Sequence, residues 1–372
     1  IGLSMAPTLT RNEPGYDPDS SLFLAFREGA FPAGELRPSR ADAVAALERL
    51  ERPLRGFPFV SDAARSVALS AIISGVVRGQ LRTCPLHAFD APTPGTGKTM
   101  LADIIGILAT GVPPSGMAYS SNGDENEKRL VSVLRAGDPV ILIDNVSGDL
   151  EGDLLCTAFT QETIQARILG LSEVVRLSTR SLLVVTGNNL RLKGDLTRRA
   201  IICRLDAEME NPEEREFDFD AVDDVRRARP QLVIDALTIL RAFDAAGRPV
   251  KPLAFGSFAD WNLVRGALMW LGLRDPCDTR IGVRADDPVI EQRAQLFVAL
   301  LKSYGADRRF TIKSIADQGI EPGSLASEIA QLLYGGKWNS RAAGHLLRRH
   351  KDIPLLGVTL RSNQTPIRAQ EY

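Results

Sequence analysis

The chain has 372 residues, of which 44% are hydrophobic and 24% are charged. At about 150 residues per domain this length predicts two or three domains, and the composition excludes a largely disordered, collagen-like or coiled-coil protein. The longest apolar stretch, residues 67–77, is far shorter than the roughly 18 residues of a membrane-spanning helix, so we expect no membrane partner.

The net charge of −1 hides an uneven distribution along the chain. Residues 206–224 hold ten acidic side chains and one basic one, whereas residues 293–351 hold ten Lys or Arg against four Asp or Glu. The basic excess predicts a polyanion as the partner of the C-terminal part. A solvated basic face is the alternative that charge alone leaves open.

The elements predicted in chain order describe an α/β protein. The first 40 residues are rich in Pro, Gly and Asp and are predicted to form an extended arm or linker. Helices follow at residues 43–50, with Ser39 or Asp42 near the N-cap, and at about 61–78. From residue 86 onward, short apolar runs alternate with helix-length segments, the pattern of a mostly parallel sheet. The five predicted strands are residues 86–89, 117–120, 140–143, 182–185 and 201–205.

Beyond the strands, the acidic residues 206–224 are predicted to form a surface loop that leaves this doubly wound domain. Further helices are predicted at residues 230–243, 258–271 and 289–304.

The cysteine and histidine spacings exclude the usual metal and dithiol sites. Four cysteines lie at least 47 residues apart, and the three histidines form no His-Glu-x-x-His motif. Free thiols and the lack of a signal-peptide pattern predict a cytoplasmic protein. Because the chain begins with Ile1 rather than Met, we expect it to be part of something longer.

A phosphate-binding loop follows the first predicted strand and leads into an apolar-periodic helix. Its two glycines let successive backbone N–H groups face phosphate oxygens, and the helix N-terminus adds partial positive charge. Lys98 is predicted to reach the β- and γ-phosphates of ATP, and the Thr99 hydroxyl to coordinate Mg²⁺. Pro92 stands where the motif has its first glycine. The residues predicted to bind nucleotide are Pro94, Gly95, Thr96, Gly97, Lys98, Thr99 and Met100.

Acidic residues of the same predicted site follow the second and third predicted strands. Asp144 ends the run 140–143 and is predicted to hold Mg²⁺. Asn145 comes next, where many such ATPases have a glutamate that activates water. An amide cannot take a proton, so the general base lies elsewhere or Asp144 does both. Glu125, with Glu127 nearby, is the candidate base, and an exposed acidic helix start is the alternative for both.

Polar groups also lie around the fourth and fifth predicted strands. Asn188 is predicted to orient the attacking water, although an Asx turn explains the same Gly-Asn-Asn sequence. Arg198 and Arg199 directly precede the fifth strand and are predicted to stabilise charge on the phosphate of a neighbouring subunit. Pairing of an arginine with the acidic loop is the alternative.

In this order, the elements resemble an AAA+ ATPase, and more narrowly the superfamily 3-like helicase domain of phage, prophage and plasmid primase–helicase proteins. Residues 94–99 match the AAA+ phosphate loop, residues 140–145 the Walker B strand and residues 184–189 the sensor 1 strand. Arg198 and Arg199 stand where the arginine finger is expected. Residues 56–60, 187–199 and 270–273 carry the narrower likeness, and the resemblance covers roughly residues 53–273. Pro92 and Asn145 depart from the pattern.

The resemblance implies ATP and Mg²⁺ as cofactors, single-stranded or forked DNA as partner, and a homo-oligomer that we expect to be a hexamer. It also implies a primase domain in the same full-length chain. In such helicases a hairpin between Walker B and sensor 1 tracks the DNA backbone in the central channel, and residues 167–177 have a hairpin pattern. Arg167 and Arg176 flank it and are predicted to contact DNA, a purely structural role being the alternative.

The C-terminal residues are predicted to form a winged-helix-like domain. Helical patterns at residues 310–316, 324–333 and 340–350 precede a predicted strand at 357–361. Arg341, His345 and Arg348 share one face of the third helix and are predicted to bind DNA. Docking to a protein is the alternative.

The sequence therefore predicts an α/β protein with a P-loop AAA+-type parallel sheet flanked by helices, which works as an ATP-dependent, ring-forming replicative DNA helicase. An ATPase that remodels or loads nucleoprotein without unwinding, and an ATP-binding scaffold, are the alternatives. The predicted divisions are an N-terminal arm and helix at 1–60, the ATPase domain at 61–225, a helical lid or linker at 226–290 and the basic domain at 291–372.

Overall fold

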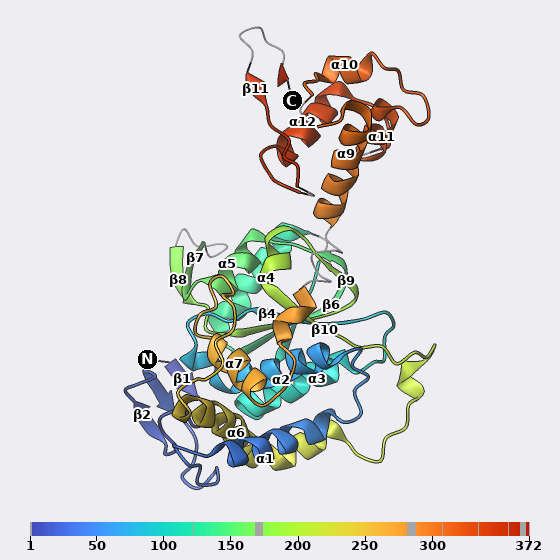
Figure 1. Cartoon of the computed structure of the whole chain (residues 1–372). Helices are drawn as coiled ribbons and strands as arrows, with labels where there is room; N and C mark the ends of the chain where they lie inside the picture. The colour runs from blue at the N-terminus through green and yellow to red at the C-terminus, as the bar shows by residue number, and fades with distance from the viewer. Residues whose placement is uncertain are drawn as a thin grey trace. The chain divides into compact units, whose positions relative to one another are not determined.

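The computed structural model describes residues 2–120, 122–167, 174–280, 288–306, 308–333, 335–355, 357–364 and 370–371. The chain divides into two compact units, Ile1–Arg284 and Ala285–Tyr372, whose elements are drawn in Figure 1. Within the described ranges, no helix is both long and apolar enough to cross a bilayer.

The centre of the first unit is a five-stranded parallel sheet in the order β10-β4-β9-β6-β5. The apolar runs that predicted β4, β6, β9 and β10 are buried, as expected for a parallel sheet covered by helices. The predicted helix-flanked parallel sheet is thus confirmed, although β5 is displaced by two residues and β6 and β9 extend past their predicted ends. The strands are β4 (Leu86–Ala91), β5 (Ser115–Ala118), β6 (Val140–Leu150), β9 (Leu182–Leu192) and β10 (Ala200–Arg204).

Helices cover both faces of this sheet (Figure 1). The central helix α2 (Asp62–Val77) is apolar on nearly all sides and almost wholly buried, which explains why it lies against the strands. Of the two residues predicted near the N-cap of α1 (Arg40–Glu51), Ser39 is the N-cap, and Asp42 completes a capping box with it. On the side of α2 lie also α3 (Lys98–Thr110), α6 (Ala221–Ala245) and α7 (Asn262–Trp270), and on the other side α4 (Gly123–Ala136) and α5 (Asp153–Thr160).

The N-terminal segment is not the extended arm or linker that we predicted. It forms a small sheet in the order β1-β3-β2, and Leu22 and Leu24 are buried. The nearly inaccessible guanidinium of Arg241 on α6 holds the segment by donating to the backbone oxygens of Thr8, Leu9 and Glu35. The prediction failed because these hydrogen bonds join residues more than two hundred positions apart and have no local signal in the sequence. The strands are β1 (Gly2–Ser4), β2 (Gly15–Asp17) and β3 (Leu22–Leu24).

The acidic segment 206–220 does not simply leave the domain as a surface loop. It contains a short 3₁₀ turn, η4 (Pro212–Glu214), and folds back over the loop that follows β4. Arg215 fixes it there, because its guanidinium donates to the backbone oxygen of Thr96 at 3.2 Å and to that of Gly56 at 3.3 Å. Helix α6 then begins well before the predicted position, with Asp220 as its N-cap and Pro230 inside it.

An antiparallel hairpin of β7 (Thr163–Arg167) and β8 (Val174–Ser178) connects α5 to β9. Its pairing runs from Thr163 opposite Ser178 to Arg167 opposite Val174, so a hairpin is present where one was predicted, with its paired strands reaching beyond the predicted residues 167–177. Residues 168–173, which include the predicted turn, lie outside the described residues.

The second unit is a small helical domain with its own core, built around Leu296, Ile315, Ile329 and Leu347. Its helices after α9 agree with the three predicted helical patterns. The strand predicted at residues 357–361 is absent, because Leu355 and Val358 exchange backbone hydrogen bonds across a turn with Gly357 at φ 76°. The elements are α9 (Pro288–Tyr304), α10 (Ile312–Ala316), α11 (Leu325–Gln331), α12 (Ser340–His350), β11 (Asn363–Gln364) and β12 (Gln370–Glu371).

Candidate functional site

The glycine-rich loop connects the end of β4 to the start of α3. Gly95 and Gly97 have φ angles of 77° and 101°, a backbone conformation that glycine adopts without strain. Lys98 is the first residue of α3, and its Nζ donates to Thr93 O and Thr96 Oγ1, both at 3.2 Å. The loop therefore curls around the lysine and presents the uncapped N-terminus of α3, where an anion is stabilised.

The strand order brings the predicted site residues together. β9 lies between β4 and β6, and β4 ends opposite Asn188, so the middle parts of β6 and β9 lie next to the loop that follows β4. A cavity of about 430 Å³ opens there. It is lined by Pro94 to Met100 of the loop, by Asp144 and Asn145 of β6, and by Thr186, Gly187 and Asn188 of β9.

A hydrogen-bonded chain orients Asp144 in this cavity. The hydroxyl of Thr186 donates to Asp144 Oδ1 and accepts from the backbone N–H of Asn145 at 3.1 Å. One carboxylate oxygen is thus occupied by the protein. Asp144 of β6 and Thr99 of α3 line the same cavity. Their carboxylate and hydroxyl oxygens are the kind of ligand that Mg²⁺ prefers.

Asn188 is half-buried, and its Oδ1 has no hydrogen-bond partner among the described residues. A buried polar atom without a partner is costly unless a ligand or water satisfies it. The amide oxygen therefore marks a position where the cavity accepts a hydrogen-bond donor.

The electrostatics at Lys98 have two opposing parts. Burial lowers the pKa of its ammonium group, while the nearby carboxylates of Asp90 and Asp144 raise it. A phosphate in the cavity would add negative charge next to this cation, so binding of an anion would compensate the burial.

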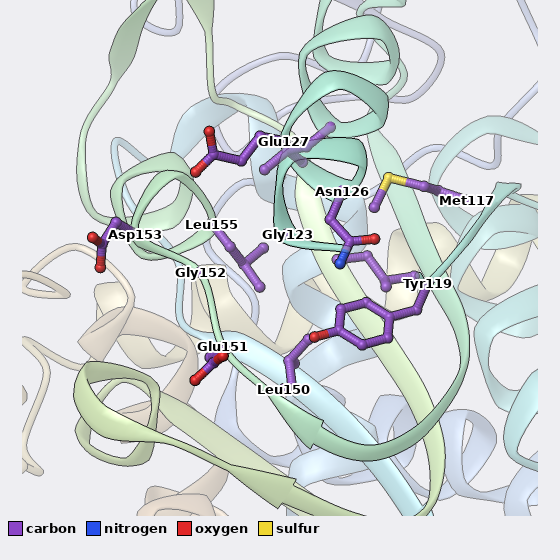
Figure 2. Close-up of a pocket in the computed structure, with 12 residues that line it drawn as sticks. Met117, Tyr119, Gly123, Asn126, Glu127, Leu150, Glu151, Gly152, Asp153 and Leu155 are labelled. Atoms are coloured by element: carbon purple, nitrogen blue, oxygen red, sulfur yellow. The ribbon is translucent and has the colours of Figure 1, made fainter. Parts of the chain in front are cut away.

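The structure does not bring the candidate bases Glu125 and Glu127 to this cavity. Glu125 on α4 forms an ion pair with Arg129 at 3.1 Å. Glu127 lines a different cavity of about 350 Å³, whose lining also includes Glu151 and Asp153 (Figure 2). Asp144 is the only carboxylate among the described residues that line the cavity at the glycine-rich loop.

Arg198 and Arg199 lie at the opposite edge of the sheet from the loop. In the parallel register Ala200 pairs with Leu86, so the two arginines precede the amino end of β10, whereas the loop follows the carboxyl end of β4. Both arginines pair with Asp195. The side chain of Arg199 is 23% exposed and also donates to Thr160 Oγ1, whereas that of Arg198 is 59% exposed.

A second pocket, which the sequence analysis missed, adjoins the glycine-rich loop. It has a volume of about 490 Å³ and shares Gly95, Thr96, Gly97 and Met100 with the first cavity. Aromatic rings form its walls, with Phe57 so close to Gly97 that a Cβ there would lie 2.9 Å from the ring. The sequence signal that could have predicted this pocket is the presence of Phe217 and Phe219 within the otherwise acidic segment 206–224. The remaining lining residues include Glu213, Arg215, Phe217 and Phe219.

None of the candidate DNA-contacting residues is among the described residues that line the cavity at the glycine-rich loop. Arg176 on β8 is exposed, and Arg167 lies opposite Val174 at the end of the described part of the hairpin. In the second unit, Arg341, His345 and Arg348 are exposed on α12, as predicted from their spacing. The buried face of that helix is formed by Ala343, Gly344, Leu346, Leu347 and His350.

Comparisons with known proteins give only distant likenesses. No protein-family profile matches the chain, and no curated protein sequence matches it. The A-form apo structure of the NrS-1 C-terminal region aligns over 96% of this chain and 83% of that one, with a TM-score of 0.47 and 10% identity. A structure of the NrS-1 C-terminal region 305–718 aligns over 86% and 71%, with a TM-score of 0.42 and 11% identity. At this degree of similarity the alignments do not bear on what this chain does.

Proposed function

We propose that this chain hydrolyses ATP to drive movement along DNA, as the helicase part of a superfamily 3-like AAA+ protein. The observation that carries the proposal is the single cavity lined by the glycine-rich loop, by Asp144 and by Asn188. These are the groups that phosphoryl transfer to water requires at one place: a phosphate cradle, a carboxylate and a polar group that orients water.

The nucleotide would lie across both pockets at the loop. The triphosphate binds to the backbone N–H groups of residues 94–99 and to Lys98, and Thr99 and Asp144 would hold Mg²⁺, which would neutralise phosphate charge. The Asn188 carboxamide orients the attacking water. Asp144 accepts its proton, because it is the only carboxylate among the described lining residues. The purine base fits the adjoining aromatic pocket of Phe57, Phe217 and Phe219.

The position of Arg198 and Arg199 supports a homo-oligomer, which we expect to be a hexameric ring. The length of the strands separates the two arginines from the glycine-rich loop of their own chain, because the arginines precede the amino end of β10 and the loop follows the carboxyl end of β4. They therefore reach a phosphate only in a neighbouring copy. Arg198 is the better candidate finger, because Arg199 is also held by Thr160.

Two basic surfaces support DNA as the partner, single-stranded or forked. One is the exposed face of α12 with Arg341, His345 and Arg348, and the other is the hairpin that carries Arg167 and Arg176. Guanidinium groups on an exposed helix face bind phosphates without reading sequence, which suits a motor that must track any strand.

The test is ATP hydrolysis with and without single-stranded DNA, measured on the wild type and on Lys98→Ala. We expect DNA to stimulate the wild type and Lys98→Ala to lose at least about 100-fold in kcat, because the loop loses its phosphate-contacting cation. Lys128→Ala, which removes an exposed lysine on α4, is the control and should behave as the wild type. Full turnover by Lys98→Ala would contradict the assignment of the site.

A second candidate function, an ATP-binding scaffold, is favoured by one observation. Asn145 occupies the position after Asp144, and neither Glu125 nor Glu127 lines the cavity. Tight ATP binding without turnover, with or without DNA, would support the scaffold. DNA-stimulated turnover without strand displacement would instead support a remodelling or loading ATPase.

A further inference from the structure

Asp90 is a buried carboxylate that the proposed reaction does not yet use. It lies on β4, two residues before Pro92, and is only 6% exposed. Asp90 lies opposite Gly187 on β9 and opposite Arg204 on β10. It is therefore between β9, which carries Asn188, and β10, which follows Arg198 and Arg199. Burial raises the pKa of this carboxyl, and Leu190 N–H, Arg204 and Lys98 oppose the rise.

The carboxylate completes the hydrogen bonding at the tip of β9. The pairing of β4 with β9 ends at Ala91 opposite Asn188, and Asn189 then turns into the left-handed region with φ 51°. Leu190 is buried and lies beyond the end of the β4–β9 pairing, so its N–H has no backbone acceptor on β4. Asp90 Oδ1 accepts from that N–H at 2.8 Å, and a buried backbone donor of this kind must be satisfied.

A second contact ties the same tip to the glycine-rich loop. The side-chain amide of Asn189 donates to Pro92 O at 3.3 Å. Asn188 and the two residues that follow it are therefore fixed: Ala91 pairs with Asn188, Pro92 holds Asn189, and Asp90 holds Leu190. The unpartnered Oδ1 of Asn188 is thereby held at the cavity.

We propose that Asp90 is a positioning residue for ATP hydrolysis, whose carboxylate fixes the tip of β9 so that Asn188 faces the attacking water. The inference rests on the proposed function. Asp90 does not line the cavity, so it acts through Asn188 and not on the nucleotide.

The experiment compares kcat and KM for ATP in the whole chain among Asp90→Ala, Asp90→Asn, Asn188→Ala and the double variant Asp90→Ala/Asn188→Ala. Asp90→Ala should lower kcat about tenfold and change KM less than about threefold, because orientation in the transition state is lost while binding stays. Asp90→Asn keeps an oxygen that accepts from Leu190 N–H and should remain within about threefold of the wild type. In the double variant, kcat should equal that of Asn188→Ala, since residues that act as a unit are not additive.

Asp235→Asn is the control for a merely structural effect. Asp235 is also a buried carboxylate, 1% exposed and paired with Arg49, and it lies on α6 away from the cavity. This variant should lower the melting temperature and leave kcat unchanged. A wild-type kcat for Asp90→Ala, or a further tenfold loss in the double variant, would overturn the positioning role. A wild type that binds ATP without hydrolysing it would overturn the proposed function itself.

Discussion

Asn145 illustrates how a single residue satisfies a backbone requirement at the site. It has a φ of 56°, in the left-handed region that Asn tolerates far better than most side chains. The irregularity between Ile143 and Val146 in the β6–β9 pairing produces this conformation. It lets Thr186 contact both the Asp144 carboxylate and the Asn145 N–H. An asparagine at this position therefore has a conformational reason that is independent of catalysis.

His87 gives the residue-scale prediction. Its ring is buried between β4 and α2, Nδ1 donates to Pro85 O at 3.0 Å, and Nε2 faces the Ser70 hydroxyl at 3.1 Å. Burial lowers the pKa of this histidine to about 3. In the unfolded chain it is protonated below about 6.5, so the unfolded state binds the extra proton first and the free energy of unfolding falls as the pH drops from 6.5 towards 3.

Well below pH 6.5, His87 lowers the free energy of unfolding by about 1.4 kcal/mol for each pH unit of acidification. Urea unfolding at pH 7, 6 and 5 measures it, and His87→Asn should flatten the pH dependence because its amide does not titrate. His345→Asn is the matched control, since His345 is exposed on α12. Comparing slopes within each variant removes the cost of the substitution itself. Equal slopes for the wild type and His87→Asn would contradict the prediction.

At the scale of elements, α12 combines a core face with a basic face. Leu346 and Leu347 pack into the second unit, while Arg341 and Arg348 stay exposed. Its last turn holds Arg348 and Arg349, cations that the negative end of the helix stabilises. Arg348 therefore serves both the stability of the helix and the proposed binding of phosphate.

Replacing Arg341 and Arg348 together by Ala should weaken binding to single-stranded DNA and reduce the slope of log K against log salt by about two, one per lost phosphate contact. Equilibrium titration between low and moderate salt measures this slope. The double variant Arg226→Ala/Arg227→Ala also removes two exposed arginines, each paired with an aspartate on α6, and should leave the slope unchanged. An unchanged slope for the α12 variant would favour docking to a protein.

At the scale of the whole molecule, the polarity of the parallel sheet separates the two halves of the proposed reaction. The glycine-rich loop lies at the carboxyl edge and the arginine pair at the amino edge. Five residues of strand at about 3.3 Å each span roughly 17 Å, which is too far for one chain to use both on one phosphate. Two copies would complete each other's sites, and this accounts for the expected ring.

Mixing subunits tests this arrangement. Arg198→Ala/Arg199→Ala and Lys98→Ala should each be inactive alone, and mixed subunits should regain part of the ATPase activity. The intact arginines of one variant then face the intact loop of the other. A mixture of Lys98→Ala with Asp144→Ala should stay inactive, because both variants damage the same half. If the first mixture is as inactive as the second, the arginines do not act between copies.

What the sequence by itself determined is local in the chain. The apolar runs of β4, β6, β9 and β10, the capping of α1 by Ser39, the glycine-rich loop and the exposed face of α12 all follow from residues within one or two turns or strands of each other. Hydrophobic periodicity and capping chemistry act over this range, so these features could be predicted.

What only the tertiary structure decided involves residues far apart in the chain. Arg215 holds the acidic segment on Thr96, Arg241 holds the N-terminal sheet, and Asp90 satisfies the N–H of Leu190. Each contact satisfies a buried polar group with a partner about one hundred or more residues away. Strand order and packing select these partners, and no pattern in the neighbouring sequence encodes which one is selected.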